Sequence, residues 1–114
     1  MVLPDKVKYE GEWNIVSDQP DGIGKAISPD GSVYEGCWSH GVRQGMGRKI
    51  FFNGDVYEGE WVNNHYNGEG TYTFSKGDLY KGSWMDNKKH GKGRYTWAGG
   101  AYYMGPYYMD ARHG

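Results

Sequence analysis

Cysteine, leucine and long apolar runs are scarce or absent in this chain of 114 residues. Cys37 is the only cysteine, which excludes an intrachain disulfide, and leucine occurs only at Leu3 and Leu79. No apolar stretch approaches the length of a signal-peptide core or a membrane-spanning helix. We therefore expect a cytoplasmic protein whose interior does not depend on aliphatic side chains.

An excess of charge of either sign is also missing. Lysine and arginine number 13 and aspartate and glutamate 14, which gives a formal net charge of −1. Domains that bind nucleic acid usually carry a strongly basic surface. The sequence therefore predicts that nucleic acid is not a partner.

Glycine and aromatic residues, in contrast, are abundant, with 20 glycines and 17% aromatic residues. They recur in a five-residue motif, Tyr-x-Gly-x-Trp, whose leading tyrosines are 25, 23, 23 and 23 residues apart. The motif begins at Tyr9, Tyr34, Tyr57 and Tyr80 and, in a divergent form with Pro106 and Tyr107, at Tyr103. A fixed period of this length is typical of proteins built from stacked repeats.

A second element, Gly-x-Gly, follows each complete motif and begins at Gly22, Gly45, Gly68 and Gly91. Aromatic and polar residues alternate around both elements, which is typical of half-buried strands. Residues that tolerate positive φ follow the motif by three positions, at Gly41, Asn64, Asn87 and Asp110. Each unit of 23 residues is therefore predicted to form one β-hairpin.

The unit from Tyr57 to Gly77 has the pattern Tyr-x-Gly-x-Trp-x-x-Asn-x-x-x-Gly-x-Gly, with a further glycine seven residues later. This pattern resembles the MORN repeat (membrane occupation and recognition nexus). The resemblance extends over residues 9 to 114. It implies an all-β fold, an elongated and twisted antiparallel sheet of stacked β-hairpins with one hairpin per repeat.

In this scheme residues 1–8 are a short N-terminal lead-in, and residues 9–114 form the MORN-repeat domain. The domain has four full repeats, starting at Tyr9, Tyr34, Tyr57 and Tyr80, and a partial fifth starting at Tyr103. Since the fifth unit stops halfway, we expect the sequence to be a fragment of a longer protein.

The aromatic face is the first candidate for a binding site. In a single-layer sheet only curvature covers that face, so some rings are expected to line an exposed groove that binds a protein partner, either an extended peptide or an amphipathic helix. The predicted groove residues are Tyr34, Trp38, Tyr57, Trp61, Tyr72, Phe74, Tyr80, Trp84, Tyr95 and Trp97.

Basic residues around the hairpin turns are the second candidate. If the repeats stack in register, we expect them to form a positive row along one rim, which could contact anionic lipid headgroups. These residues are Arg43, Arg48, Lys49, Lys88, Lys89, Lys92, Arg94 and Arg112.

Nothing in the sequence predicts catalysis, a metal or a cofactor. His90 and His113 hold equivalent positions one repeat apart, about 10 Å, which is too far to share a zinc ion. The Gly-x-Gly elements lack the third glycine of a dinucleotide fingerprint. No serine has a recognisable histidine and aspartate partner, so we expect a protein that is not an enzyme.

Proteins with MORN repeats include radial-spoke and other ciliary proteins, cytoskeletal scaffolds of protists and junctophilins. The resemblance therefore implies a non-catalytic scaffold in a ciliary, axonemal or cytoskeletal assembly. Two alternatives stay open: an adaptor for anionic phospholipids such as phosphoinositides, and a regulatory module of a larger lipid kinase or SET-type methyltransferase. Open strand edges also allow end-to-end self-association.

Overall fold

The fold is known from a computed structural model, which describes residues 6–108 and 111–112. Ten strands follow one another in these residues: β1 (Lys8–Asn14), β2 (Gln19–Ile27), β3 (Val33–Ser39), β4 (Val42–Ile50), β5 (Val56–Val62), β6 (His65–Thr73), β7 (Leu79–Met85), β8 (Lys88–Thr96), β9 (Tyr102–Tyr108) and β10 (Ala111–Arg112).

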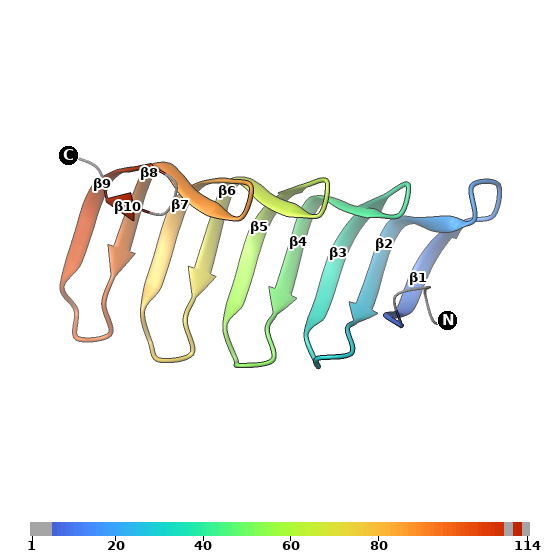
Figure 1. The fold of residues 1–114 in the computed structure, drawn as a ribbon, viewed down its shortest axis with the longest axis horizontal. Coiled ribbons are helices and arrows are strands. Elements are labelled where there is room, and N and C mark those ends of the chain that lie inside the picture. Colours follow the sequence, from blue (N-terminus) through green and yellow to red (C-terminus); the bar gives the residue numbers. More distant parts are fainter. Residues whose placement is uncertain (1–5, 109–110, 113–114) are drawn as a thin grey trace.

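All ten strands belong to one antiparallel sheet, in which each strand pairs with its neighbours in the sequence. The hairpins stand side by side along the long axis of a body that measures 48 × 24 × 18 Å (Figure 1). Each hairpin also curves along its length, so the sheet is not flat (Figure 1). The predicted all-β fold, a sheet of stacked hairpins with one hairpin per repeat, is confirmed.

The tight turns within the hairpins follow from residues that adopt positive φ. Asn63 and Asn64, between β5 and β6, have φ values of 53° and 72°, and Asp86 and Asn87 repeat this geometry at 48° and 69°. Two successive residues with positive φ make the turn whose twist matches the flanking strands. Gly41, with φ of 84°, completes the same turn between β3 and β4. The predicted turn at Asp110 lies outside the described residues.

The core is a continuous series of aromatic rings, which we call the inner ladder. Tyr34, Tyr57 and Tyr80 each pack edge-on against the last aromatic residue of their own motif and of the next, with ring centroids 4.9 to 5.6 Å apart. At the two ends of the series, Tyr9 makes such a pair only with Trp38 of the next motif, and Tyr103 with Tyr107 of its own. Such edge-to-face pairs contribute about 0.5–1.5 kcal/mol each beyond the burial of area. The ladder contains Tyr9, Trp38, Tyr34, Trp61, Tyr57, Trp84, Tyr80, Tyr107 and Tyr103.

Paired glycines make room for this ladder. Gly59 on β5 faces Gly70 on β6, and a Cβ atom on Gly59 would be 2.5 Å from the Gly70 Cα, so the two backbones approach too closely for any side chain. The Tyr57 ring lies over Gly70, and its hydroxyl donates a hydrogen bond to the Glu60 carbonyl (2.8 Å). The same tyrosine-to-carbonyl bond recurs at Tyr34 and Tyr80. The glycine lattice is therefore a packing requirement of the core.

Candidate binding surface

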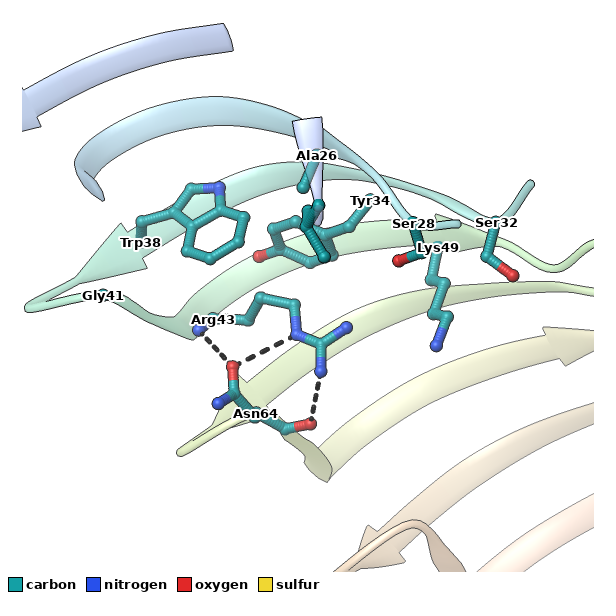
Figure 2. A pocket seen from close by; sticks show the side chains of 10 residues that line it. Ala26, Ser28, Ser32, Tyr34, Trp38, Gly41, Arg43, Lys49 and Asn64 are labelled. Atoms are coloured by element: carbon teal, nitrogen blue, oxygen red, sulfur yellow. Dashed lines mark hydrogen bonds between the residues drawn. The ribbon is translucent and has the colours of Figure 1, made fainter. Parts of the chain in front are cut away.

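Six of the ten rings predicted to line an exposed groove belong to the buried core. Tyr57 and Tyr80 have no exposed surface, and Trp38, the most exposed of the six, is 8% exposed. Figure 2 shows Tyr34 and Trp38 side by side. The expectation of exposure is therefore wrong for these residues: Tyr34, Trp38, Tyr57, Trp61, Tyr80 and Trp84. The physical reason is the curvature of the sheet, which closes around the rings and packs each tyrosine between two neighbouring rings.

The other four predicted rings keep accessible surface and form a second series, which we call the outer ladder. Its successive ring centroids lie 5.6, 4.6, 5.6 and 5.0 Å apart, in the order Phe51, Tyr72, Phe74, Tyr95 and Trp97. All five side chains are half-buried. Tyr72 and Tyr95 lie at the ends of β6 and β8, and Phe51, Phe74 and Trp97 lie in the turns that follow β4, β6 and β8. The outer ladder therefore runs across the strands on the same face as the inner ladder.

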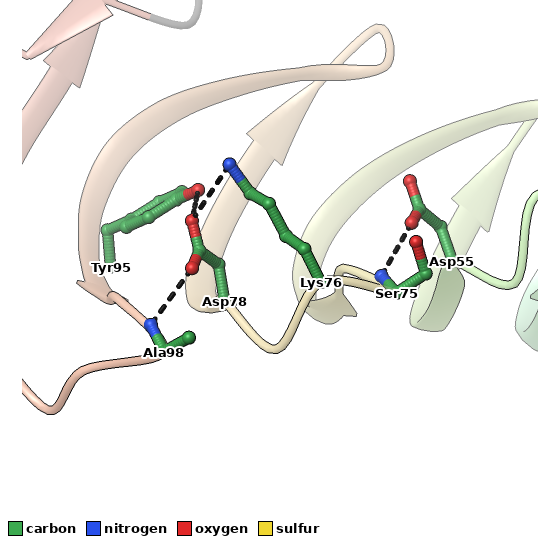
Figure 3. A network of polar contacts seen from close by, with 6 residues as sticks. All are labelled: Asp55, Ser75, Lys76, Asp78, Tyr95 and Ala98. Atoms are coloured by element: carbon green, nitrogen blue, oxygen red, sulfur yellow. Dashed lines mark hydrogen bonds and ion pairs between the residues drawn. The ribbon is translucent and has the colours of Figure 1, made fainter.

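Two buried aspartates hold the outer ladder in place. The Tyr95 hydroxyl donates a hydrogen bond to Asp78 Oδ2 (2.6 Å), and the Ala98 amide donates to Asp78 Oδ1 (2.9 Å), as Figure 3 shows. Asp55 makes the equivalent bonds with the Tyr72 hydroxyl (2.8 Å) and with the Ser75 amide (2.7 Å). Each aspartate therefore ties a ladder tyrosine to the turn that follows its strand.

These bonds shift the pKa values of both partners. The hydrogen bond from Tyr95 is the main cause that lowers the pKa of Asp78, with help from the Ala98 amide and Lys76. Burial opposes the ionised form of Asp55, but hydrogen bonds from the Ser75 amide and Tyr72 outweigh burial and lower the pKa of that carboxyl group. Burial, together with the bond to Asp78, raises the pKa of Tyr95 to about 12. Both aspartates are therefore ionised and both tyrosines neutral at pH 7.

Two aromatic residues of this face that lie outside the Tyr-x-Gly-x-Trp motifs were missed by the sequence prediction. Phe51 occupies the repeat position of Phe74 and Trp97, so aligning the repeats would have found it. Tyr66 is half-buried and stacks on the inner ladder at Tyr57, with ring centroids 4.3 Å apart. The equivalent positions in the neighbouring repeats hold the cations Arg43 and Lys89, so an alignment of the repeats does not predict a ring at position 66.

The basic residues do not form one positive row, and that prediction is wrong. Alternate residues of a strand point to opposite faces, and the pairing register divides the basic residues between the faces. On the aromatic face lie Arg43, Lys49 and Lys89, and on the opposite face lie Arg48, Lys88, Lys92 and Arg94. Arg112 pairs with Tyr107 through its backbone, and its side chain lies outside the described part of the structure.

The cations on the aromatic face lie against rings. The Arg43 guanidinium is 5.0 Å from the centroid of Trp61, and the Lys49 ammonium is 4.7 Å from that of Phe51. Lys89 lies within 6.0 Å of four rings, among them Trp84 and Tyr95. Such cation–π contacts are favourable by about 0.5–2 kcal/mol, depending on desolvation. The aromatic face therefore presents positive charge next to apolar surface.

Two features are absent from the described residues. No three histidine, cysteine, aspartate or glutamate side chains come together there as ligands for a metal ion. No helix in the same residues is long and apolar enough to span a membrane.

The arrangement of repeated hairpins agrees with the comparisons with known proteins. The family described as MORN repeat matches four consecutive segments, residues 9–33, 34–56, 57–79 and 80–102. A comparison with curated protein sequences found no significant match. The MORN repeat is a non-catalytic repeat module, which serves as a scaffold in protein or membrane interactions. Since the matched segments cover most of the sequence, the chain belongs to the MORN repeat family.

Proposed function

We propose that the chain is a non-catalytic scaffold that binds a protein partner along the outer ladder. The observation that carries this proposal is the continuity of the five half-buried rings from Phe51 to Trp97. Large aromatic side chains are the favoured anchors of protein interfaces. An extended peptide or an amphipathic helix could lay a row of apolar side chains along these rings.

Preorganisation of the outer ladder supports the same proposal. Tyr72 and Tyr95 are fixed by Asp55 and Asp78, and both rings, like that of Phe51, pack against the buried core. Ordering a flexible side chain at an interface costs about 0.5–1.5 kcal/mol. A partner that binds to rings already fixed avoids this part of the cost.

The test is a selection of displayed peptides on the immobilised chain. We expect selected peptides to carry apolar or aromatic residues, and their affinity to fall at least tenfold in Phe74→Ala and Trp97→Ala. Met46→Ala is the matched control, because Met46 is 58% exposed and lies outside both ladders. Peptides that bind all three variants as tightly as the original chain would contradict the proposal, provided that circular dichroism shows the variants to be folded.

We place this scaffold in a cytoskeletal or ciliary assembly, and the support for this part is membership of the MORN repeat family alone. Expression of the tagged chain in ciliated cells tests it. Enrichment along the axoneme or cytoskeleton is the expected result, and a uniform cytoplasmic distribution would contradict it. A catalytic domain in the parent transcript would instead favour a regulatory module of a lipid kinase or SET-type methyltransferase.

A second candidate function, binding to anionic phospholipid, is favoured by one feature of the opposite face. Charges alternate between paired strands early in the sheet, for example Glu35 opposite Arg48 and Arg48 opposite Glu58. The alternation ends at Thr71, which lies opposite Glu58, and further along the sheet Lys81 lies directly opposite Arg94. With Lys92 and the exposed Met104, this cluster combines positive charge with apolar surface.

Co-sedimentation with vesicles tests the second candidate. Binding to phosphoinositide-containing vesicles should exceed binding to neutral vesicles and weaken with salt, because exposed charges are screened. Arg94→Glu should abolish the difference. Arg48→Glu is the matched control, since Arg48 occupies the same repeat position between two glutamates. Equal binding to both vesicle types would exclude this function.

A further inference from the structure

A hollow of about 180 Å³ opens on the aromatic face between the first and second repeats (Figure 2). Tyr34 and Trp38 of the inner ladder contribute to its wall, and Ser28 and Ser32 line it from the turn between β2 and β3. Since a water molecule occupies about 30 Å³ in the liquid, the space is large enough for a carboxylate or phosphate group.

The hollow exists because the first repeat has small residues where later repeats have large ones. Ala26 occupies the repeat position of Tyr72 and Tyr95, and Ser28 occupies that of Phe74 and Trp97. The outer ladder therefore has no rings in the first repeat. Its end at Phe51 adjoins the hollow, because Lys49, which lines the hollow, also contacts the Phe51 ring.

Ser32 shows the most informative difference between the repeats. It occupies the position of Asp55 and Asp78, and like them it accepts a hydrogen bond from a turn amide, that of Phe52 (3.2 Å). The structural role of this position is therefore retained in the second repeat, but its negative charge is absent.

Two cations, Arg43 and Lys49, line the same hollow as Ser32. The Arg43 guanidinium donates from Nε to Asn64 Oδ1 (3.2 Å) and from Nη2 to the Asn64 carbonyl (3.3 Å), which fixes its position (Figure 2). Lys49 extends from the same strand toward the hollow. Among the described residues that line the hollow, none is an aspartate or glutamate.

The electrostatics of Lys49 agree with a site that has positive charge in excess. Burial lowers the pKa of the Lys49 ammonium, and the nearby Arg43 lowers it further, whereas Asp30 acts in the opposite direction. The Asp30 carboxylate itself accepts a hydrogen bond from the Ser32 amide (2.8 Å). An additional anion between the two cations would relieve their repulsion and replace water around a half-buried charge.

We propose that this hollow binds an oxyanion, the carboxylate or phosphate group of an acidic residue in the partner segment that lies on the outer ladder. Arg43 and Lys49 supply the charge, and the Ser28 hydroxyl, which also lines the hollow, supplies a hydrogen bond. The peptide part of this inference rests on the proposed function. It adds that the partner has an acidic or phosphorylated residue next to its apolar row.

The first experiment titrates the whole chain with inorganic phosphate at low ionic strength and follows the Arg43 Nε–H and the Lys49 methylene signals by NMR. We expect saturable shifts of both. Ser32→Asp, which restores the charge found in later repeats, should weaken binding at least tenfold, whereas Ser32→Asn should bind within about twofold of the original chain. Lys49→Met should also abolish saturation, and Lys25→Met, on the opposite face, is its control.

The second experiment compares peptides obtained by selection on the original chain, synthesised with glutamate, phosphoserine or alanine at the acidic position. Alanine should weaken binding at least tenfold on the original chain and have no effect on Lys49→Met. Stronger binding of the phosphoserine peptide than of the glutamate peptide would identify phosphate as the preferred group, and the reverse would identify carboxylate.

The two experiments separate this inference from the proposed function. Absence of saturable phosphate shifts, or equal phosphate affinity in Ser32→Asp and Ser32→Asn, would overturn the oxyanion site. Selected peptides with an apolar row but no acidic preference would overturn the inference and leave the proposed function standing. If no peptide is selected, the proposed function and the peptide part of the inference both fail, while the phosphate titration still decides the oxyanion site.

Discussion

The Tyr57 ring lies over Gly70 of the paired strand and fills the space that a side chain at position 70 would need. A Cβ atom built on Gly70 would be 2.5 Å from Cζ of Tyr57 and 2.6 Å from its Cε1. The same relationship joins Tyr9 to Gly24, Tyr34 to Gly47 and Tyr80 to Gly93. Each repeat therefore couples the first residue of its Tyr-x-Gly-x-Trp motif to the second glycine of its Gly-x-Gly element.

Replacement of Gly70 by alanine should destabilise the protein, because the new methyl group overlaps a ring that has no room to move. Overpacking of this kind costs about 1–3 kcal/mol. The measurement is the free energy of unfolding from urea denaturation. Gly99→Ala is the matched control, since a Cβ atom at position 99 meets no atom within 4 Å. Equal stability of the two variants would show that the Tyr57 ring can move aside for the new methyl group at little cost in free energy.

Truncation of a ring in the inner ladder should destabilise the fold strongly, whereas truncation of a ring in the outer ladder should leave the protein folded. Trp61 is 2% exposed, so Trp61→Ala should cost about 3–5 kcal/mol and unfold much of the protein. Trp97 is half-buried at the end of the outer ladder, so Trp97→Ala should cost about 1 kcal/mol and leave the fold intact. Thermal denaturation followed by circular dichroism compares them. A stably folded Trp61→Ala variant would contradict the assignment of the inner ladder as the core.

Stability should fall in acid because of Asp55 and Asp78. Their hydrogen bonds lower both pKa values below that of an unfolded aspartate, about 3.9. Ionised aspartate therefore stabilises the fold fully above about pH 4, and this contribution is lost as the pH falls through the lower folded-state values.

Urea denaturation at neutral pH, at pH 4 and at a lower pH measures this loss. The Asp78→Asn variant should be less stable at neutral pH and should show a weaker dependence on pH in the acid range. A variant that loses stability in acid as steeply as the original chain would show that other carboxylates cause the effect.

The ladder tyrosines should stabilise the fold up to high pH. Burial raises the pKa of Tyr57, with a smaller effect from Glu60, and burial also raises those of Tyr34 and Tyr72. An unfolded tyrosine titrates near 10, so this contribution is complete below about pH 10 and is lost as the pH rises toward the folded-state values. Tyrosinate absorbance should therefore appear in two stages, the second together with unfolding. A single transition near pH 10 in a chain that stays folded would contradict the burial of these rings.

The proposed oxyanion site and the outer ladder could be predicted only in part, because equivalent positions of the repeats must be compared with one another and then placed in space. Tyr72, Phe74, Tyr95 and Trp97 were predicted as surface rings from their alternation alone. Phe51 was missed although it holds the same repeat position. The difference between Ser32 and Asp55 is visible in the sequence, but it has meaning only once Arg43 and Lys49 are known to line the same hollow as Ser32.

The sequence by itself determined the repeat period, the hairpins, their order in the sheet and membership of the MORN repeat family, because local alternation, turn residues and glycine spacing depend on neighbours along the chain. Only the tertiary structure decided which rings are buried and which cations share a face. Alternation assigns Trp61 and Trp97 to one face without distinguishing them. Rings from its own repeat and from the preceding one, among them Tyr57 and Tyr34, enclose Trp61, whereas Trp97 contacts Tyr95 at the end of the outer ladder and stays accessible. Such contacts between repeats are set by the assembled sheet and not by neighbours along the chain.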